Sequence, residues 1–196
     1  MSIRPAVPED CLAIARICLL TGDNGDDATG LFCDDAALAD VFALPYLAGP
    51  GGFALVWDEG DGVVGYVLGT SDTVGFQEWF SDVWWPQRAT REPRTDGDAW
   101  LLPDAADPRR TLGSVVGEYP AHLHIDLLPS AQGRGAGRAL IEAACSLLAD
   151  RGVPGVHLVA AAANAGAVAF YPRVGFAEAS RDEGSVTFAR ALPADE

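Results

Sequence analysis

Apolar positions along this chain follow two different spacings, which separate strands from helices. Short apolar runs bounded by Gly, Pro and Asp are typical of strands, whereas apolar residues three and four apart are typical of helices. The pattern predicts strands over 3–7, 53–57, 63–68, 121–128, 156–162 and 185–189, and helices over 8–19, 36–44, 75–88, 135–150 and 165–173. An antiparallel hairpin with its turn at 58–62, followed by strands that alternate with helices, predicts a mixed α/β sheet.

Three segments have the composition of connections. Residues 21–30 are polar and contain glycine, residues 90–117 are rich in Pro, Asp, Arg and Gly, and residues 191–196 are expected to be a loose tail. A loop as long as 90–117 inside a compact domain is either functional or disordered. Because no repeat or linker divides the 196 residues, we expect one domain over 1–196.

A glycine-rich segment, residues 132–138, separates the strand at 121–128 from the helix at 135–150. Amide N–H groups at a helix start have no partner within the helix, and the helix dipole adds partial positive charge there. Glycines let an anion approach that backbone closely, and Arg134 and Arg138 add formal positive charge. The segment therefore predicts a phosphate-binding site, although it matches neither the Rossmann pattern nor the P-loop pattern.

The pattern Q/R-x-x-G-x-G/A is met here by Gln132, Gly135 and Gly137. In this respect the segment resembles the pyrophosphate loop of the GCN5-related N-acetyltransferases, which bind acetyl-coenzyme A. The resemblance implies acetyl-CoA as the cosubstrate.

A second segment resembles the same family and lies one helix and one strand further along the chain. The family pattern N-x-x-A-x-x-x-Y-x-x-x-G-F is matched at every spaced position by Asn164, Ala167, Tyr171, Gly175 and Phe176. Two matched motifs in the right order imply the family's fold. That fold is a mixed, mostly antiparallel sheet flanked by helices, in which two central strands splay apart to hold the coenzyme.

A narrower resemblance covers residues 119–176. The string Tyr-Pro-Ala-His-Leu-His-Ile-Asp-Leu-Leu-Pro at 119–129 is similar to the acetyltransferase-like domain attached to animal O-GlcNAcases and to its bacterial relatives. The animal domains have a degraded phosphate loop, whereas this chain keeps Gln132, Gly135 and Gly137. A working coenzyme site is therefore expected.

The residues that the resemblance assigns to the coenzyme lie on the end of the central strand, on the glycine-rich segment and on the second motif. They are Ile125, Asp126, Leu127, Leu128, Gln132, Gly133, Arg134, Gly135, Ala136, Gly137, Arg138, Asn164, Ala167, Phe170 and Tyr171. No metal is expected, because neither the four cysteines nor the three histidines have the spacing of zinc ligands.

The resemblance also implies direct attack of an amine on the acetyl thioester. Tyr171 stands where the family has the tyrosine that protonates the leaving thiolate, and Asn164 stands where a side chain binds the pantetheine arm. From the residues alone, Tyr171 also suits packing beneath its helix, and Asn164 also suits a helix N-cap.

The general base is left open between two leading residues, with Glu118 and the aspartates near Asp26 as weaker possibilities. His122, His124 and Asp126 alternate along the predicted central strand, so they share one face. A histidine beside an aspartate can act as a base near neutral pH. The family often places its base at positions that here hold Leu123 and Ala121, which cannot accept a proton. Asp126 and His124 are therefore the candidate bases, and either one also suits a structural polar role.

The net charge of the chain bears on which classes of molecule it can bind. The chain has 13 basic and 28 acidic residues and a formal charge of −15, which argues against nucleic-acid binding and is compatible with an amine or a basic peptide. No apolar run is long enough to span a membrane, and residues 1–10 do not resemble a secretory signal. We expect a cytoplasmic protein.

Three functions follow from these observations. The first is an N-acetyltransferase acting on a small-molecule amine, and the second is an acetyltransferase of a protein lysine, as in histones. The third is an acetyl-CoA-binding module without turnover. The segment 90–117, which precedes the central strand, is expected to form a lid or a wall on the acceptor side. The sequence leaves the oligomeric state open.

Overall fold

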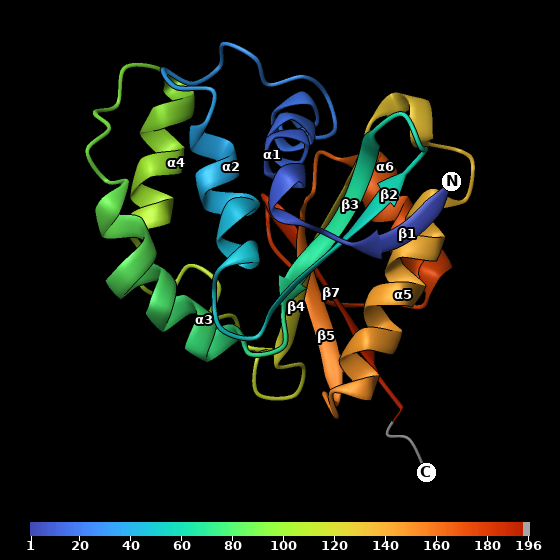
Figure 1. Ribbon diagram of the computed structural model, residues 1–196. Coiled ribbons are helices and arrows are strands. Elements are labelled where there is room, and N and C mark those ends of the chain that lie inside the picture. The colour runs from blue at the N-terminus through green and yellow to red at the C-terminus, as the bar shows by residue number, and fades with distance from the viewer. Residues whose placement is uncertain (194–196) are drawn as a thin grey trace.

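A seven-stranded sheet forms the centre of the computed structural model, which describes residues 1–193 (Figure 1). In spatial order its strands are β1 (Ser2–Pro5), β2 (Gly52–Asp58), β3 (Val63–Thr70), β4 (Ala121–Leu127), β5 (Gly155–Ala161), β7 (Ser185–Ala191) and β6 (Ala177–Arg181). All neighbouring pairs are antiparallel except β4 and β5, which are parallel. The sheet is therefore mixed and mostly antiparallel, as expected.

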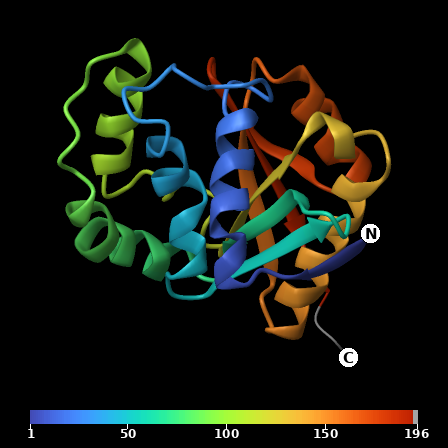
Figure 2. The ribbon, with the colours of Figure 1, turned by 45° about the horizontal axis from the view of Figure 1, so that its top comes forward.

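Helices cover both faces of this sheet. The α-helices are α1 (Cys11–Leu20), α2 (Ala37–Phe42), α3 (Thr73–Trp79), α4 (Asp96–Ala106), α5 (Ala136–Asp150) and α6 (Ala165–Phe170). Short 3-10 or π-helical turns are η1 (Pro8–Asp10), η2 (Leu44–Leu47), η3 (Phe80–Trp84), η4 (Trp85–Gln87), η5 (Pro129–Ala131) and η6 (Tyr171–Val174). Helices α1 to α4 lie on one side and α5 and α6 on the other, with α4 outermost beyond α2 (Figure 2).

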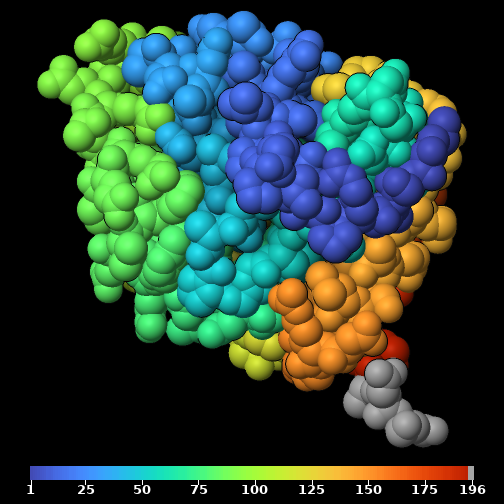
Figure 3. Space-filling model, in the orientation of Figure 1, coloured from blue at the N-terminus to red at the C-terminus, as the bar shows by residue number. Residues whose placement is uncertain are grey.

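Two hydrophobic cores follow from the alternation of side chains along the strands. Tyr66 and Leu68 of β3 pack into the core beneath α1 to α4, whereas the intervening Val67 packs into the core beneath α5. The space-filling view shows α3 and α4 as a continuous outer side of the molecule next to α2 (Figure 3). Within residues 1–193, no helix has both the length and the apolar character needed to cross a membrane.

The sheet opens between its two central strands. β4 pairs with β5 only through Ala121 with Val156 and His122 with His157, whereas β5 pairs with β7 along its whole length. Beyond His122 the two strands diverge, so Val159 of β5 remains 60% exposed. The expected splay of the central strands is thus present, and it begins directly after His122.

The segment 90–117, expected to be one long loop, contains helix α4. A capping box starts this helix, because Thr95 Oγ1 accepts from the Asp98 amide at 3.1 Å while the Asp98 carboxylate accepts from the Thr95 amide at 3.0 Å. Asp98 is fully buried and also accepts from the Cys33 amide at 3.2 Å. Burial alone would raise the pKa of Asp98, but the amides of Arg94 and Cys33 hold it well below its usual range.

Three smaller expectations also need correction. The helix expected over 75–88 is interrupted, since α3 ends at Trp79 and continues as the turns η3 and η4. Strand β6 was not expected at all, and its side chains are exposed throughout. The expected loose tail begins too early, because Ala191 ends β7 and Leu192 is buried. Residues 194–196 lie outside the described residues.

Close packing of β3 against β4 depends on glycine at position 69. A Cβ atom on Gly69 would lie 2.1 Å from the carbonyl oxygen of His122 and 2.9 Å from Cα of Leu123. Both contacts are with the backbone, which cannot rotate away as a flexible side chain can. Gly69 therefore permits the strand spacing that positions the histidines of β4.

Gly69→Ala is expected to lower the free energy of unfolding by about 3 kcal/mol, because the added methyl group forces β3 and β4 apart. Urea denaturation measures the change. Gly117→Ala is the matched control, since Gly117 is exposed and a Cβ there meets no atom within 4 Å. Equal stability of the two variants would contradict the close approach of the strands.

Candidate active site

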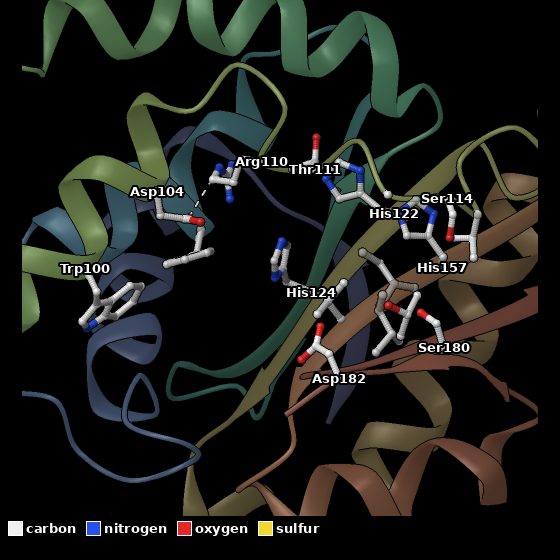
Figure 4. Close-up of a pocket in the computed structure, with 17 residues that line it drawn as sticks. Trp100, Asp104, Arg110, Thr111, Ser114, His122, His124, His157, Ser180 and Asp182 are labelled. Carbon is white, nitrogen blue, oxygen red and sulfur yellow. Dashed lines mark ion pairs between the residues drawn. The ribbon is translucent and has the colours of Figure 1, made fainter. Parts of the chain in front are cut away.

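Two cavities are lined by consecutive residues of β4, at the place where β5 diverges. The first, of about 510 Å³, is lined by His122, Leu123 and His124 and is bounded by α4, and we call it the α4 cavity (Figure 4). The second, of about 710 Å³, is lined by Ile125, Asp126 and Leu127 and by the glycine-rich segment, and we call it the glycine-loop cavity. Successive residues of one strand thus serve two sites.

Backbone conformation explains the glycines of residues 132–138. Gly133 and Gly135 have φ angles of +70° and +86°, in the left-handed region that other residues rarely adopt, and Gly135 is the N-cap of α5. A Cβ at either position would meet no atom within 4 Å, so conformation and not space requires glycine here. In the described chain, the amides of residues 133–135 have no hydrogen-bond acceptor. They form an anion-binding surface together with the start of α5.

Two arginines border the glycine-loop cavity, and one of them was not expected. Arg138 lines the cavity and donates to the carbonyl oxygen of Arg173 at 2.6 Å, and Arg173 itself lines the cavity. Arg134, which was expected to bind the ligand, instead pairs with Glu59 at 2.9 Å and is not among the lining residues. No motif signal marks Arg173, because it joins the cavity through the turn η6.

Most residues expected at the coenzyme site line this same cavity. They are Ile125, Asp126, Leu127, Gln132, Gly133, Gly135, Gly137, Arg138, Asn164, Ala167, Phe170 and Tyr171. Leu128 packs against the core beneath α1 to α4, and Ala136 is buried in the first turn of α5, so neither side chain reaches the cavity. The chain after α1 adds Thr21, Asn24, Gly25 and Asp26, which sequence patterns did not assign to this cavity.

Asn164 and Tyr171 come from the two ends of α6. The Asn164 side chain caps this helix by accepting from the Ala167 amide at 2.9 Å, and it lines the cavity at the same time. Tyr171 is 8% exposed and packs its ring against aromatic neighbours including Phe176 and Phe188. Burial, together with the negative charge of Asp126, raises the pKa of Tyr171, so the phenol stays protonated at neutral pH.

Hydrogen bonds on the α4 side define the protonation of the histidines. Thr73 Oγ1 donates to the carbonyl oxygen of Pro120 at 2.7 Å, so it accepts from Nδ1 of His122 at 2.8 Å. Nε2 of His122 then accepts from the Tyr46 hydroxyl at 2.8 Å, and that oxygen accepts from Nε2 of His124 at 3.0 Å. This assignment from the network leaves Nδ1 of His124 with a free lone pair.

Burial keeps these imidazoles neutral. It lowers the pKa of His122 well below its usual range, with further contributions from His124 and His157. Burial and the positive charge of Arg110 lower the pKa of His124 to about 3. Although the three rings are neighbours, no group of three metal-ligating side chains in residues 1–193 is arranged to hold a metal ion.

Asp126, the other candidate base, has a different environment. Its side chain shares a face of β4 with His124, as expected, but lines the glycine-loop cavity and accepts from the Tyr66 hydroxyl at 2.5 Å. Burial raises its pKa, and the hydrogen bond from Tyr66 opposes that shift. The two candidate bases therefore lie on one face of β4 and line different cavities.

The segment 90–117 forms one wall of the α4 cavity. Trp100 and Asp104 project from α4, and Arg110 and Thr111 follow on the connection to β4 (Figure 4). Trp100 is 50% exposed, an unusual fraction for so large an apolar ring. The opposite side is lined by Ser180 and other residues of β5, β6 and β7. A wall formed by 90–117 beside β4 was expected from the sequence, whereas the contribution of β5, β6 and β7 to this cavity was not.

Known proteins resemble this chain over almost its whole length. A family model described as Acetyltransferase (GNAT) family matches residues 26–176. The crystal structure of SsHAT has 38% sequence identity and a TM-score of 0.88, with 98% of each chain covered.

More distant structures share the fold. The ribosomal-protein-S18-alanine N-acetyltransferase from Escherichia coli has 16% identity and a TM-score of 0.57, covering 100% of this chain and 96% of its own. A spermidine N-acetyltransferase from Vibrio cholerae has 13% identity and a TM-score of 0.57, covering 98% of this chain and 95% of its own.

The buried histidines predict a loss of stability in mild acid. His122 and His157 have folded pKa values below the unfolded value of about 6.5. The unfolded state therefore binds more protons below that pH, so the free energy of unfolding falls as pH decreases. The slope reaches about 1.4 kcal/mol per pH unit for each neutral histidine. Urea denaturation between pH 7.5 and 5 measures it.

Imidazole NMR titration separates this effect from the carboxylates. His157→Gln is the control, because glutamine can still donate to the Tyr119 carbonyl oxygen, which Nδ1 of His157 contacts at 2.7 Å. The variant should have a smaller slope than the original chain. Ordinary titration of His122 and His157 near pH 6.5 in the folded protein would contradict the neutral network.

Proposed function

The chain belongs to the acetyltransferase (GNAT) family, and on that premise we propose that it transfers acetyl from acetyl-CoA to a small amine. One observation carries this proposal: consecutive residues of β4 line two differently equipped cavities where β4 separates from β5. The glycine-loop cavity has the groups that bind a pyrophosphate, and the α4 cavity has a histidine with a free lone pair. A coenzyme and an acceptor placed in the two cavities meet at β4.

The groups around the glycine-loop cavity suit acetyl-CoA. The free amides of residues 133–135 and the start of α5 would bind the pyrophosphate, with Arg138 and Arg173 supplying positive charge. Asn164 keeps its side-chain amide group for the pantetheine arm, because only its oxygen is used to cap α6. Within residues 1–193, the β5-facing edge of β4 has no strand partner beyond His122, and its backbone N–H groups are proposed to stabilise an oxyanion.

The reaction needs one proton acceptor and one proton donor. The amine nitrogen forms a bond to the acetyl carbon, the carbon–sulfur bond breaks, and the thiolate carries away the electron pair. A base takes the proton that the amine loses, and an acid returns a proton to sulfur. Such transfers typically contribute about 10²–10⁴-fold to the rate.

Tyr171 is the proposed acid. It lines the glycine-loop cavity, its pKa is raised by burial and by Asp126, and it therefore carries its proton throughout the physiological range. The family resemblance of the motif around it supports the same role.

His124 is the proposed proton acceptor, acting through Nδ1. It lines the cavity proposed for the amine, whereas Asp126 lines the coenzyme side and is already hydrogen-bonded to Tyr66. Asp126 is proposed to hold Tyr66 and to influence Tyr171 electrostatically. The low pKa of His124 is the specific observation that favours the second candidate function, a coenzyme-binding module without turnover.

A small acceptor is proposed in preference to a protein lysine. The α4 cavity, of about 510 Å³, lies within the usual range of small-molecule sites, about 300–1,000 Å³. The likeness of residues 119–129 to the acetyltransferase-like domain of O-GlcNAcases supports a relationship to that branch of the family.

Thiol release from acetyl-CoA tests the proposed function. The assay uses amines, amino sugars and histone-like peptides as acceptors, with calorimetric measurement of coenzyme binding alongside. Release with a small amine supports the enzyme. Coenzyme binding without release from any acceptor supports the module.

Gly135→Ala is expected to weaken acetyl-CoA binding at least about tenfold, because a φ of +86° strains any residue with a Cβ and moves the amides that hold the phosphates. Isothermal calorimetry measures the affinity. Gly152→Ala is the matched control, since Gly152 has a φ of +72° at the other end of α5 and lies outside the cavity lining. Equal affinities in the two variants would remove the glycine loop from the coenzyme site.

Tyr171→Phe is expected to lower kcat by about 10²-fold with little change in coenzyme affinity, because the ring packing is kept and only the proton donor is lost. Steady-state kinetics and calorimetry together measure the split. Tyr119→Phe serves as a control for loss of a hydroxyl outside both cavity linings. An unchanged kcat in Tyr171→Phe would assign the proton to another donor.

A further inference from the structure

Arg110 has an unusual environment for a buried cation. Its side chain is only 5% exposed, and its Nε and Nη2 atoms are the buried side-chain nitrogens or oxygens in residues 1–193 that lack a hydrogen-bond partner. A buried guanidinium without partners is costly, and native structures usually satisfy it. The fold therefore keeps two guanidinium donors of Arg110 without an acceptor among the described residues.

Neighbouring side chains hold Arg110 in place without satisfying those donors. Asp104 Oδ2 lies 4.0 Å from Nε, at the limit of an ion pair, and the Asp104 side chain is 44% exposed. The guanidinium carbon lies 4.8 Å from the ring centre of Phe80 and 5.5 Å from that of Phe42. These rings contact the guanidinium and supply no acceptor to Nε and Nη2.

Arg110 lines the α4 cavity, and Nε and Nη2 are buried beneath its surface. Figure 4 shows the Arg110 head group and the His124 ring pointing into the same space, with Trp100 on the α4 side. Arginine presents its N–H groups as a planar fork, which matches the two oxygens of a carboxylate. The half-exposed Trp100 ring adds an apolar surface for the rest of a small molecule.

We propose that the α4 cavity accepts a small amine that also carries a carboxylate, and that Arg110 binds this carboxylate. This inference rests on the proposed function, because the amine is the group that receives acetyl. It narrows the acceptor to amino-carboxylates, in preference to polyamines, simple amines and amino sugars.

Electrostatics provides a second reason for a carboxylate. The charged and titratable groups around His124 are Arg110, Asp104, Asp182, Tyr46, His122 and His157. Among them, the Asp182 carboxylate already accepts from the Gly184 amide at 2.8 Å and the Ser185 amide at 2.7 Å. Arg110 contributes to the low pKa of His124. A carboxylate on Arg110 offsets that charge, so the bound acceptor raises the pKa of its own base.

Matched pairs of acceptors test the inference. The panel contains ω-amino acids from glycine to 6-aminohexanoate. Each is compared with its carboxamide, which has the same chain length and the same amine but no negative charge. Thiol release from acetyl-CoA should be at least about tenfold faster, in kcat/KM, for the acid of the best pair than for its amide.

Variants of Arg110 assign the preference to this residue. Arg110→Met should abolish the preference for the acid, and Arg110→Lys should restore part of it, because lysine keeps the charge without the planar fork. Coenzyme affinity should be unchanged, since Arg110 lies outside the glycine-loop cavity. Thermal stability of Arg110→Met should be kept or raised, because the substitution removes a buried charge.

Different failures separate this inference from the proposed function. Equal rates for acids and amides in the original chain overturn the carboxylate site while leaving the acetyltransferase in place. A preference that persists in Arg110→Met overturns the role of Arg110. If no acceptor gives thiol release, the proposed function is overturned. The binding measurement described next then tests the carboxylate site without turnover.

The binding measurement follows the His124 resonances by NMR during a pH titration. N-acetyl-4-aminobutanoate, which has the carboxylate and no free amine, should raise the pKa of His124, whereas the corresponding amide should not. Arg110→Met should eliminate the difference. The same His124 titration with both compounds would overturn the site independently of any turnover.

Discussion

The brief pairing of β4 with β5 is the constraint on which the site depends. Two parallel strands that remained paired would close the sheet and leave no room between them, but here the ladder ends at His122 and His157. The next residues of β4 then alternate between the two cavities and the core beneath α5. Gly69 sets β3 close against β4 on the other side, so the opening is confined to the β5 side. A single interruption in the ladder thus places the proposed base, coenzyme loop and acceptor wall around one strand.

Two polar side chains beneath the opening, His124 and Arg110, are in surroundings that do not suit a charged group. The order of donors from Thr73 through His122 and Tyr46 leaves a neutral His124. Arg110, in contrast, is buried where few groups can pair with its guanidinium. A neutral imidazole and an unbalanced cation next to one another are unfavourable for stability and favourable for responding to an anionic ligand. Such local conflicts are expected at functional sites and are uncommon elsewhere.

Sequence patterns brought together most residues of the glycine-loop cavity and few of those that line the α4 cavity. The glycine loop and the Asn164 motif are local features, since neighbouring residues supply the turn, the cap and the helix start. Their residue spacing can therefore be recognised in the sequence. Helix α4 was missed because Pro103 and a weak apolar pattern obscure it, although Thr95 and Asp98 form a recognisable capping box. β6 has no buried side chain to give a period. Arg110 and Arg173 acquire their places only through tertiary packing, which no local pattern records.

The two halves of the cleft come from separate lengths of chain. Most of the glycine-loop cavity is built from β4 through η6, whereas the outer wall of the α4 cavity belongs to an excursion between α3 and β4. The buried carboxylate of Asp98 attaches that segment to the rest of the fold by accepting a hydrogen bond from the Cys33 amide. The stretch between α3 and β4 can therefore vary independently of the glycine-loop cavity. Under the proposed function, a chimera that exchanges this stretch and preserves the Asp98 attachment would change the acceptor range and keep the acetyl-CoA site.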